Sequence, residues 1–417
     1  QRDDLVYQQN RQTRRTSFGE VESSARPFPV PSAALTFDFG LENLTAGIGV
    51  FGPHAYGERC FGKWNGGTCK PDSDGAARHM LVHSFLIELY LSAGIGYRFE
   101  LPAGSLSLGA TGIAAYQNND FKLVINSEIS PSPPWEEDPA NEATFRAKNL
   151  TDWKPSGIFG LAYEYEGLLL AVSYRPPIHW ESTGTARVDF PQSLDDIGAN
   201  LSDDKVAFRA WQAGSLRFGV GYEQGEHPGL PERPRFSIEL NGTWEDWSRV
   251  ERFTLDPKGD VNASELPDSA QPALRLNTFF QEKNWRDTFS LRAGASWGAL
   301  SWLTVHGGAL LETPAQTNAH TNLDFASWER YAGSLGASFH PWDFVDIKLA
   351  FMHIRSPDRQ VDDGFVFQKI PTSSCTGPDY RSPACERQGR PPGNPQNEGK
   401  WSAHYNIGSL GATFHFD

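Results

Sequence analysis

The sequence predicts an all-β fold, a single antiparallel transmembrane β-barrel of about fourteen strands with long extracellular loops. Two observations predict it. Segments of about ten residues alternate large apolar side chains with small or polar ones, and the connections between them are alternately short and long. Barrels of this kind belong to the bacterial outer membrane and, as single chains, have an even number of strands.

The average composition alone would suit a soluble protein, since the mean hydropathy is -0.48. No apolar run approaches the roughly 18 residues that a membrane-spanning helix needs. The face opposite the large apolar side chains decides the question, because it is rich in Gly, Ala and Ser instead of the Thr, Lys and Glu of a water-exposed sheet. The net charge of -14 argues against a nucleic-acid partner.

The alternation is clearest where Phe159, Leu161 and Tyr163 alternate with Gly160 and Ala162. It recurs along the chain in segments whose outer faces often end in an aromatic residue, as interfacial girdles do. The expected strands are 3–15, 31–40, 43–53, 79–99, 104–124, 153–166, 168–189, 206–222, 234–255, 286–298, 301–312, 327–340, 344–356 and 401–416.

The connections between these strands alternate in length. Short turns of such barrels face the periplasm and long loops face the outside. The expected extracellular loops lie near 16–30, 54–78, 125–152, 190–205, 256–285, 313–326 and 357–400.

Four cysteines form two close pairs, Cys60 with Cys69 and Cys375 with Cys385. Each pair lies in a long loop rich in Gly, Pro and Asn, and neither has the CxxC spacing or the neighbouring His of a zinc site. We therefore expect two short-loop disulfides on the external side, formed in an oxidising compartment, and no metal or other cofactor.

Several short motifs follow one another with a consistent spacing. The sequence thereby resembles the outer-membrane long-chain fatty acid transporter family, which also includes aromatic-hydrocarbon channels. The matching segments are 46–57, 97–109, the end of a strand at Ala171–Arg175, the segment Trp285–Phe289 with Arg292 and Gly294, and Gly307–Pro314.

The resemblance implies a fourteen-stranded barrel plugged by an N-terminal hatch. It implies uptake of hydrophobic small molecules, above all long-chain fatty acids, by capture in the loops, binding in the lumen and lateral exit at a kink in the third strand. The chain departs from this pattern at its start, where a strand is expected within the first few residues and no Asn-Pro-Ala hatch motif occurs. The hatch is cleaved, unresolved or absent.

A lateral exit requires a break in the hydrogen-bonded wall. Gly47, Gly49, Gly52 and Pro53 are suited to it, because Gly loosens a strand and Pro removes a ladder donor. The competing interpretation is an ordinary strand end before the loop at 54–78.

A fatty acid also needs a cation for its carboxylate in a lumen of low dielectric constant. The alternation places several charged side chains inward, and the competing interpretation is a charge network that stitches the lumen together. The inward-facing cations are Arg175, Arg217, Arg292 and Lys348, and the inward-facing acids are Glu164, Glu239 and Asp346.

In the family, basic residues at the outer ends of the fifth and tenth strands meet the carboxylate. The matching neighbourhoods here contain Lys122 and Lys283. If the matched positions are instead Phe121 and Gln281, the ligand would be an uncharged hydrocarbon.

Catalytic motifs are missing from the sequence. It has no HExxH and no serine nucleophile at a turn from a strand into a helix, so we do not expect an enzyme. The alternative to a channel is a structural barrel within outer-membrane lipid that binds partner proteins through its loops, for which the Pro-rich segment 390–395 of loop 357–400 would be suited.

Overall fold

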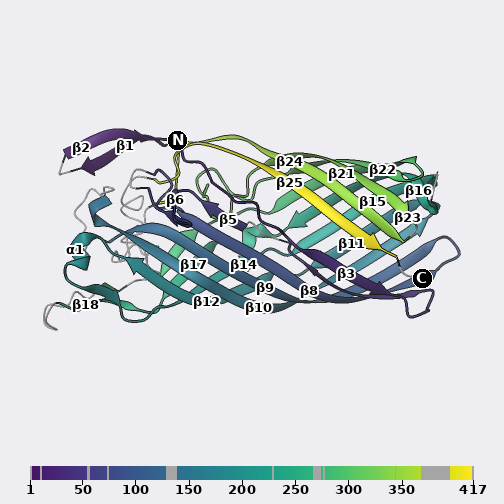
Figure 1. Cartoon of the computed structure of the whole chain (residues 1–417), viewed down its shortest axis with the longest axis horizontal. Coiled ribbons are helices and arrows are strands. Elements are labelled where there is room, and N and C mark those ends of the chain that lie inside the picture. The colour runs from purple at the N-terminus through teal and green to yellow at the C-terminus, as the bar shows by residue number, and fades with distance from the viewer. Residues whose placement is uncertain are drawn as a thin grey trace.

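The computed structural model describes residues 2–9, 12–53, 57–72, 75–127, 139–227, 230–265, 274–275, 278–342, 344–367 and 395–415. Most of them form one closed β-barrel (Figure 1). Its strands are β3 (Ser32–Phe37), β4 (Leu44–Phe51), β5 (Gly57–Cys60), β8 (His83–Glu100), β9 (Ser105–Asn126), β10 (Glu142–Tyr165), β11 (Leu168–Arg175), β12 (Ile178–Asp189), β14 (Lys205–Gln212), β15 (Ser215–His227), β16 (Leu230–Glu245), β17 (Arg252–Pro257), β20 (Phe279–Glu282), β21 (Thr288–Leu300), β22 (Leu303–Glu312), β23 (Arg330–Trp342), β24 (Val345–Val361) and β25 (Gly399–Phe414).

Smaller elements lie outside the barrel wall. They are β1 (Arg2–Gln9), β2 (Gln12–Phe18), β6 (Lys63–Asn65), β7 (Thr68–Lys70), β13 (Ala199–Leu201), β18 (Asp260–Ala263), β19 (Leu274–Arg275), the short helix α1 (Gln192–Asp195) and two 3-10 turns at Pro139–Asn141 and Trp247–Arg249. No helix in the described ranges is long and apolar enough to cross a membrane.

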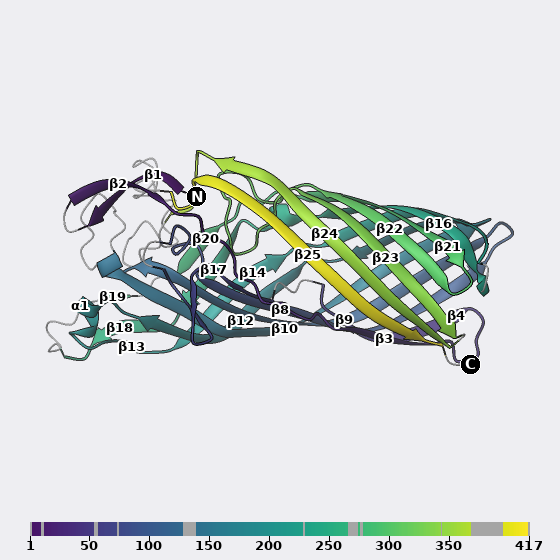
Figure 2. The same ribbon diagram turned by 45° about the horizontal axis from the view of Figure 1, so that its top comes forward.

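The barrel wall is a series of antiparallel pairs that runs β3-β4-β8-β9-β10-β11-β15-β16-β21-β22-β23-β24-β25. Because each strand reverses the direction of the one before it, β25 and β3 run in the same direction (Figure 2). The wall begins with β3, so the strand predicted at 3–15 is not part of it. That segment forms the separate β1–β2 hairpin.

Several predicted strands are each two strands in the structure. The segment predicted at 168–189 breaks at Pro176 and Pro177, which have no N–H to give to the ladder. Below the break β11 pairs with β10 and β15, whereas above it β12 pairs with β10 and β14. The segments predicted at 206–222 and 234–255 divide in the same way into β14 with β15 and β16 with β17.

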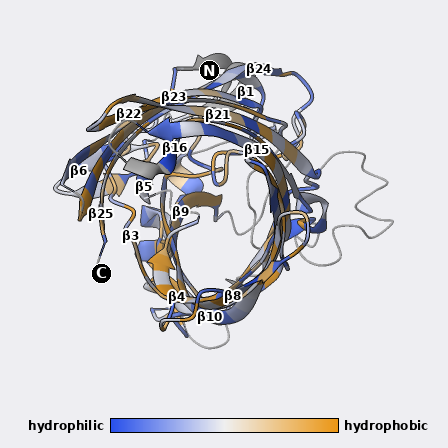
Figure 3. Ribbon diagram, turned by 90° about the vertical axis from the view of Figure 1, so that its right-hand side faces the viewer, coloured by the Kyte–Doolittle hydropathy of each residue, from blue (hydrophilic) through white to orange (hydrophobic). Residues whose placement is uncertain are grey.

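The wall carries a belt of exposed apolar side chains, such as Phe159 at 61% exposure and Leu410 at 77%. Along β9 this belt runs from Leu106 to Tyr116, eleven residues that span about 25 Å along the barrel axis at the tilt usual for such strands. That height matches the lipid-facing band of a transmembrane barrel. Figure 3 shows the wall down its axis with the mixture of apolar and polar residues around the ring.

The short connections lie at the end of the barrel where the C-terminus lies, and the small sheets lie at the opposite, extracellular end (Figure 1). Here the strands continue beyond the belt, into segments predicted as loops: β9 reaches Asn126 and β10 starts at Glu142, inside the loop predicted at 125–152. The loop predicted at 54–78 contains β5, β6 and β7, and that predicted at 256–285 contains β18, β19 and β20.

The disulfide predicted between Cys60 and Cys69 is present and buried, and it ties the β6–β7 hairpin to β5. The second predicted pair, Cys375 and Cys385, lies outside the described residues.

Candidate functional site

Three arginines face the lumen of the barrel. The strand register places Arg217 beside Ser173 of β11 and Arg292 beside Asn241 of β16, on the side of the wall opposite the exposed Phe218 and Leu291. Arg175 follows on the inner face of β11, because it lies two residues beyond Ser173.

These lumen arginines lie within electrostatic reach of one another, and Glu245 is an acid within electrostatic reach of Arg217. Arg175 donates to the Ala213 carbonyl at 2.6 Å, and Arg292 donates to the Thr243 hydroxyl at 3.0 Å. Within the described part of the chain none of the three forms an ion pair. The lumen therefore holds positive charge that its own carboxylates do not pair directly.

An apolar and aromatic wall lies next to Arg175. Tyr90, Ile113, Ala115, Ile178 and Trp180 form one buried cluster on the inner faces of β8, β9 and β12. Gln212 provides hydrogen-bond partners for the polar atoms of this cluster. The side-chain amide N–H of Gln212 donates to the Tyr90 hydroxyl at 2.9 Å, and the Trp180 indole N–H donates to the side-chain carbonyl of Gln212 at 3.2 Å. Side chains of this kind are the usual lining of a site for an apolar molecule.

The wall of the barrel is interrupted beside this cluster. β4 ends at Phe51 and β5 begins at Gly57, and Gly52 and Pro53 lie in the gap between them. On the facing strand β8, Tyr90 still pairs with Phe51 and Leu86 with Gly57, but the ladder skips the residues between. Glu88 lies there, and one of its carboxylate oxygens has no hydrogen-bond partner among the described residues.

The four residues predicted for the exit are thus separated. Gly52 and Pro53 occupy the interruption, whereas Gly47 and Gly49 lie in regular ladders with both neighbours, opposite Gly94 and Ser92 of β8. Gly52 also allows a close approach, because a Cβ there would lie 2.8 Å from a methyl carbon of Val30 and 3.1 Å from the Glu88 carbonyl oxygen.

The extracellular end of the lumen is filled by an apolar core. Phe121, Phe208 and Phe253 face inward from β9, β14 and β17, and Phe325 from the β22–β23 connection packs between them at centroid distances of 5.2 Å to Phe253 and 6.2 Å to Phe121. The segment 313–326, predicted as an external loop, therefore folds into the barrel mouth. Phe279, which lies in the predicted loop 256–285, is buried in the same core.

Lys283 lies in this core and is fully buried. Its ammonium forms an ion pair with the buried Asp324 carboxylate and lies 4.7 Å from the centre of the Phe253 ring. Burial lowers the pKa of Lys283, and the Asp324 charge opposes that shift. Because the Asp324 carboxylate already neutralises the Lys283 ammonium, Lys283 is not available to bind the carboxylate of a ligand.

The two remaining predicted cations lie elsewhere. Lys348 faces the lumen opposite Ser338, within electrostatic reach of His306 and near the periplasmic end. Lys122 is not in the lumen, because the register of β8 with β9 has no irregularity and places it on the outer face with Tyr116, while Phe121 faces inward. The lumen role predicted for Lys122 is therefore wrong.

Sequence reasoning missed several lumen residues, namely Glu88, Tyr90, Trp180, Gln212, Glu245 and Asp324. The alternation within the strand predicted at 79–99 could have placed Glu88 and Tyr90 inward, because Leu91 and Ile95 of the same strand face outward. Nothing in the local sequence pairs Lys283 with Asp324, which lies 41 residues further along the chain.

No protein-family model matches this chain, and no curated protein matches it. Solved structures do match. One is a FadL homologue of Pseudomonas aeruginosa, with a TM-score of 0.68 at 15% identity, over 98% of this chain and 83% of that one.

Two toluene transporters are also similar in structure. TbuX of Ralstonia pickettii has a TM-score of 0.54 at 14% identity, over 79% of this chain and 76% of that one. TodX of Pseudomonas putida has the same TM-score and identity, over 82% of this chain and 80% of that one. The resemblance seen in the sequence is confirmed for the fold, and the chain has the barrel fold of the FadL homologue and of the two toluene transporters.

Proposed function

We propose that this chain is an outer-membrane channel for the uptake of hydrophobic small molecules. The observation that carries the proposal is the proximity of two kinds of lumen side chain. The arginines form no ion pair within the described residues, and Arg175 lies within electrostatic reach of Tyr90, which belongs to the buried apolar cluster with Ile113, Ile178 and Trp180. An amphiphile with an apolar tail and an acidic head is complementary to both.

Long-chain fatty acids are the ligand class that fits this combination best. A carboxylate accepts two parallel hydrogen bonds from a guanidinium. Arg292 donates to Thr243, which is the cross-strand partner of Arg217, so both arginines are placed to approach the same anion. The tail would lie along the apolar cluster toward the interruption at Gly52 and Pro53, through which we propose that it leaves the lumen sideways into the membrane.

An uncharged hydrocarbon is the second candidate, and one specific observation favours it. At the extracellular end, where the family resemblance leads us to expect a cation, Phe121 faces inward and the Lys283 charge is matched by Asp324. If ligand selection takes place at this end, an acidic head group gains nothing there.

Equilibrium binding of radiolabelled oleic acid and radiolabelled toluene to the detergent-solubilised protein separates these candidates. We expect saturable oleate binding, weakened about tenfold or more by R217Q/R292Q because charge-assisted hydrogen bonds are lost. Arg355 faces outward on β24, so Arg355→Gln is the matched control and should bind oleate as the wild type does.

The outcomes assign the function. Oleate binding that is unchanged by R217Q/R292Q would contradict the carboxylate site and favour the hydrocarbon. Binding of neither probe would leave a structural barrel that binds partner proteins through its loops as the better account.

A further inference from the structure

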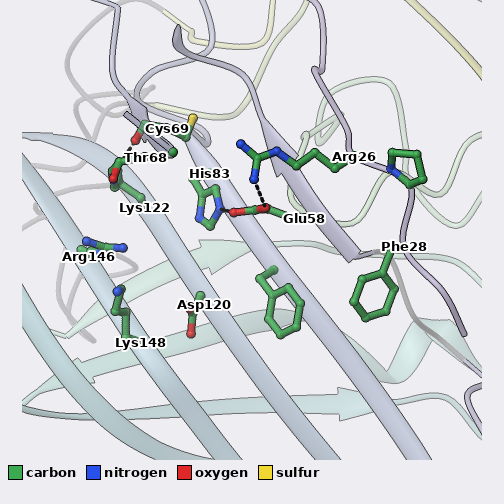
Figure 4. A pocket seen from close by; sticks show the side chains of 13 residues that line it. Arg26, Phe28, Glu58, Thr68, Cys69, His83, Asp120, Lys122, Arg146 and Lys148 are labelled. Atoms are coloured by element: carbon green, nitrogen blue, oxygen red, sulfur yellow. Dashed lines mark hydrogen bonds and ion pairs between the residues drawn. The ribbon is translucent and has the colours of Figure 1, made fainter. Parts of the chain in front are cut away.

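A second polar site lies outside the lumen, at the extracellular end of the wall. It is a pocket of about 460 Å³ on β8, β9 and β10, closed over by the segment before β3 and by the β6–β7 hairpin (Figure 4). Its charged and titratable lining consists mainly of Arg26, Glu58, His83, Lys122, Arg146 and Lys148.

The register shows that this pocket opens on the outer face of the wall. Lys122 pairs with His83 on one side and with Arg146 on the other, so the three share a face. On β9 that face also carries Leu108, which is exposed in the apolar belt, and Tyr116. A ligand in the lumen could not reach these side chains, because the sheet lies between.

The height of the pocket is fixed by the aromatic girdle. Tyr116 and Trp153 pair across β9 and β10 with ring centroids 4.9 Å apart, and Trp153 is exposed at the upper edge of the belt. Asp120 and Lys122 lie four and six residues further along β9, which is about 10–15 Å above the girdle at the usual rise and tilt. This is at or just beyond the depth of the lipid head groups, because each polar layer of a bilayer is about 5–8 Å thick.

The acids of the pocket are engaged by neighbouring groups, whereas two of its cations form no ion pair among the described residues. Glu58 lies 3.0 Å from His83 and 3.8 Å from Arg26, and Asp120 accepts the Asn149 backbone N–H at 2.7 Å. Within the described part of the chain, Arg146 and Lys148 form no ion pair with any carboxylate. The pocket therefore has a positive surplus at its open side.

Lys122 is held in place at the base of the pocket. It is only 6% exposed, and its ammonium donates to the Cys69 carbonyl at 2.5 Å. The Cys60–Cys69 disulfide fixes that carbonyl. Burial lowers the pKa of Lys122, and the neighbouring charges of Arg146 and Lys148 lower it further, so an anion beside it would stabilise its charged form.

We propose that this pocket binds a phosphate group of the phosphorylated glycolipid that forms the outer leaflet of the outer membrane, that is, the lipid A part of lipopolysaccharide. Two arginines and two lysines converge on one cavity, which is the chemistry that recognises phosphate. A glycolipid fits better than a simple phospholipid, because the cations lie at or beyond the outer edge of the polar layer. The inference rests on the proposed membrane location and is independent of the transported ligand.

Three probes test the proposal on the detergent-solubilised full chain: phosphorylated lipid A, the same lipid after removal of its phosphates, and inorganic phosphate. We expect phosphorylated lipid A to bind and the dephosphorylated lipid to bind at least about tenfold more weakly. R146Q/K148Q should weaken lipid A binding by a similar factor, whereas the outward-facing control Arg355→Gln should not.

Equal binding of the two lipids, or wild-type affinity in R146Q/K148Q, would overturn the phosphate site. Binding of inorganic phosphate without lipid A would overturn the lipid assignment. Heat-modifiable gel mobility shows that each variant is folded. Oleate binding measured on the same samples should not respond to R146Q/K148Q, so failure of this site and failure of the proposed transport function are distinguishable.

Discussion

The two halves of β9 have the same alternation but opposite surroundings. In the lower half Leu108 and Tyr116 face outward, while Gly109 faces the lumen. In the upper half the charged Lys122 faces outward and Phe121 faces inward, where it joins an apolar core. β10 changes in the same way, from outward Phe159 to outward Arg146.

The medium outside the wall explains why the apolar side chains face outward in the lower half and inward in the upper half. Lipid surrounds the lower half, so large apolar side chains are stable on the outside, and small ones leave space in the lumen. Water surrounds the upper half, so the apolar side chains gain by turning inward, as in a soluble protein. The barrel is thus a channel wall below the girdle and a packed domain with a core above it.

The largest expected effect comes from breaking the ion pair in that upper core. Lys283→Ala leaves the Asp324 carboxylate buried without its cation, which should cost about 3–5 kcal/mol. Hydrogen exchange of β17 and of the 313–329 connection should accelerate. Lys283→Met combined with Asp324→Leu should recover most of the protection, and no recovery would mean that the charges matter for more than their mutual pairing.

The alternation shows why the strands were predictable. It is a local property, and β21, β22 and β24 were placed with their starts within two residues. The break at Pro176 and Pro177 was also visible in the sequence, but its consequence was not, because only the register reveals that the upper strand changes partners.

The surroundings of each face could not be predicted in the same way. Alternation assigns Lys122 and Phe121 to opposite faces without stating which face is wet at that height. The strand segments beyond the girdle were predicted as loops, so Phe279 and Phe325 were not expected in the interior. The ion pair of Lys283 with Asp324 depends on the fold and is not visible in the local sequence. The alternation placed Arg217 and Arg292 inward correctly. Both lie below the girdle, where lipid surrounds the wall and the large apolar side chains face outward.

A second effect compares two phenylalanines, one in the upper half and one in the lower half. Phe121→Ala should destabilise the upper core by about 3 kcal/mol, because Phe208 at 5.2 Å loses its ring partner. Phe159→Ala, at a site that faces lipid, should leave the exchange of β14 and β17 unchanged. Equal loss of protection in both variants would show that the upper core is not a separate packed unit.

A third effect is a pH dependence of stability in the upper half, at Glu142. Burial raises the pKa of the Glu142 carboxyl, but the bonds and charges of His79 and Arg78 outweigh it, and the pKa falls from 4.5 to about 2. A depressed pKa stabilises the fold at neutral pH, and this contribution is lost as the pH falls from about 4.5 toward about 2. It should be on the order of 3 kcal/mol.

The free energy of unfolding, measured as a function of pH for the wild type and for Glu142→Gln, isolates the contribution of the Glu142 charge to stability. The difference between the two should shrink over that window. A constant difference would mean that the Arg78–Glu142 contact contributes no charge-dependent stability.

The central claim is that an apolar ligand occupies the lumen below the girdle, next to the three arginines. A fatty acid with a photoreactive diazirine in its tail, cross-linked to the protein and located by mass spectrometry, tests it most directly. The account predicts adducts on the inward-facing Ile113, Ile178 and Trp180 that excess unlabelled oleate suppresses. Adducts confined to the lipid-facing Phe159 and Leu161, with no effect of unlabelled oleate, would contradict it.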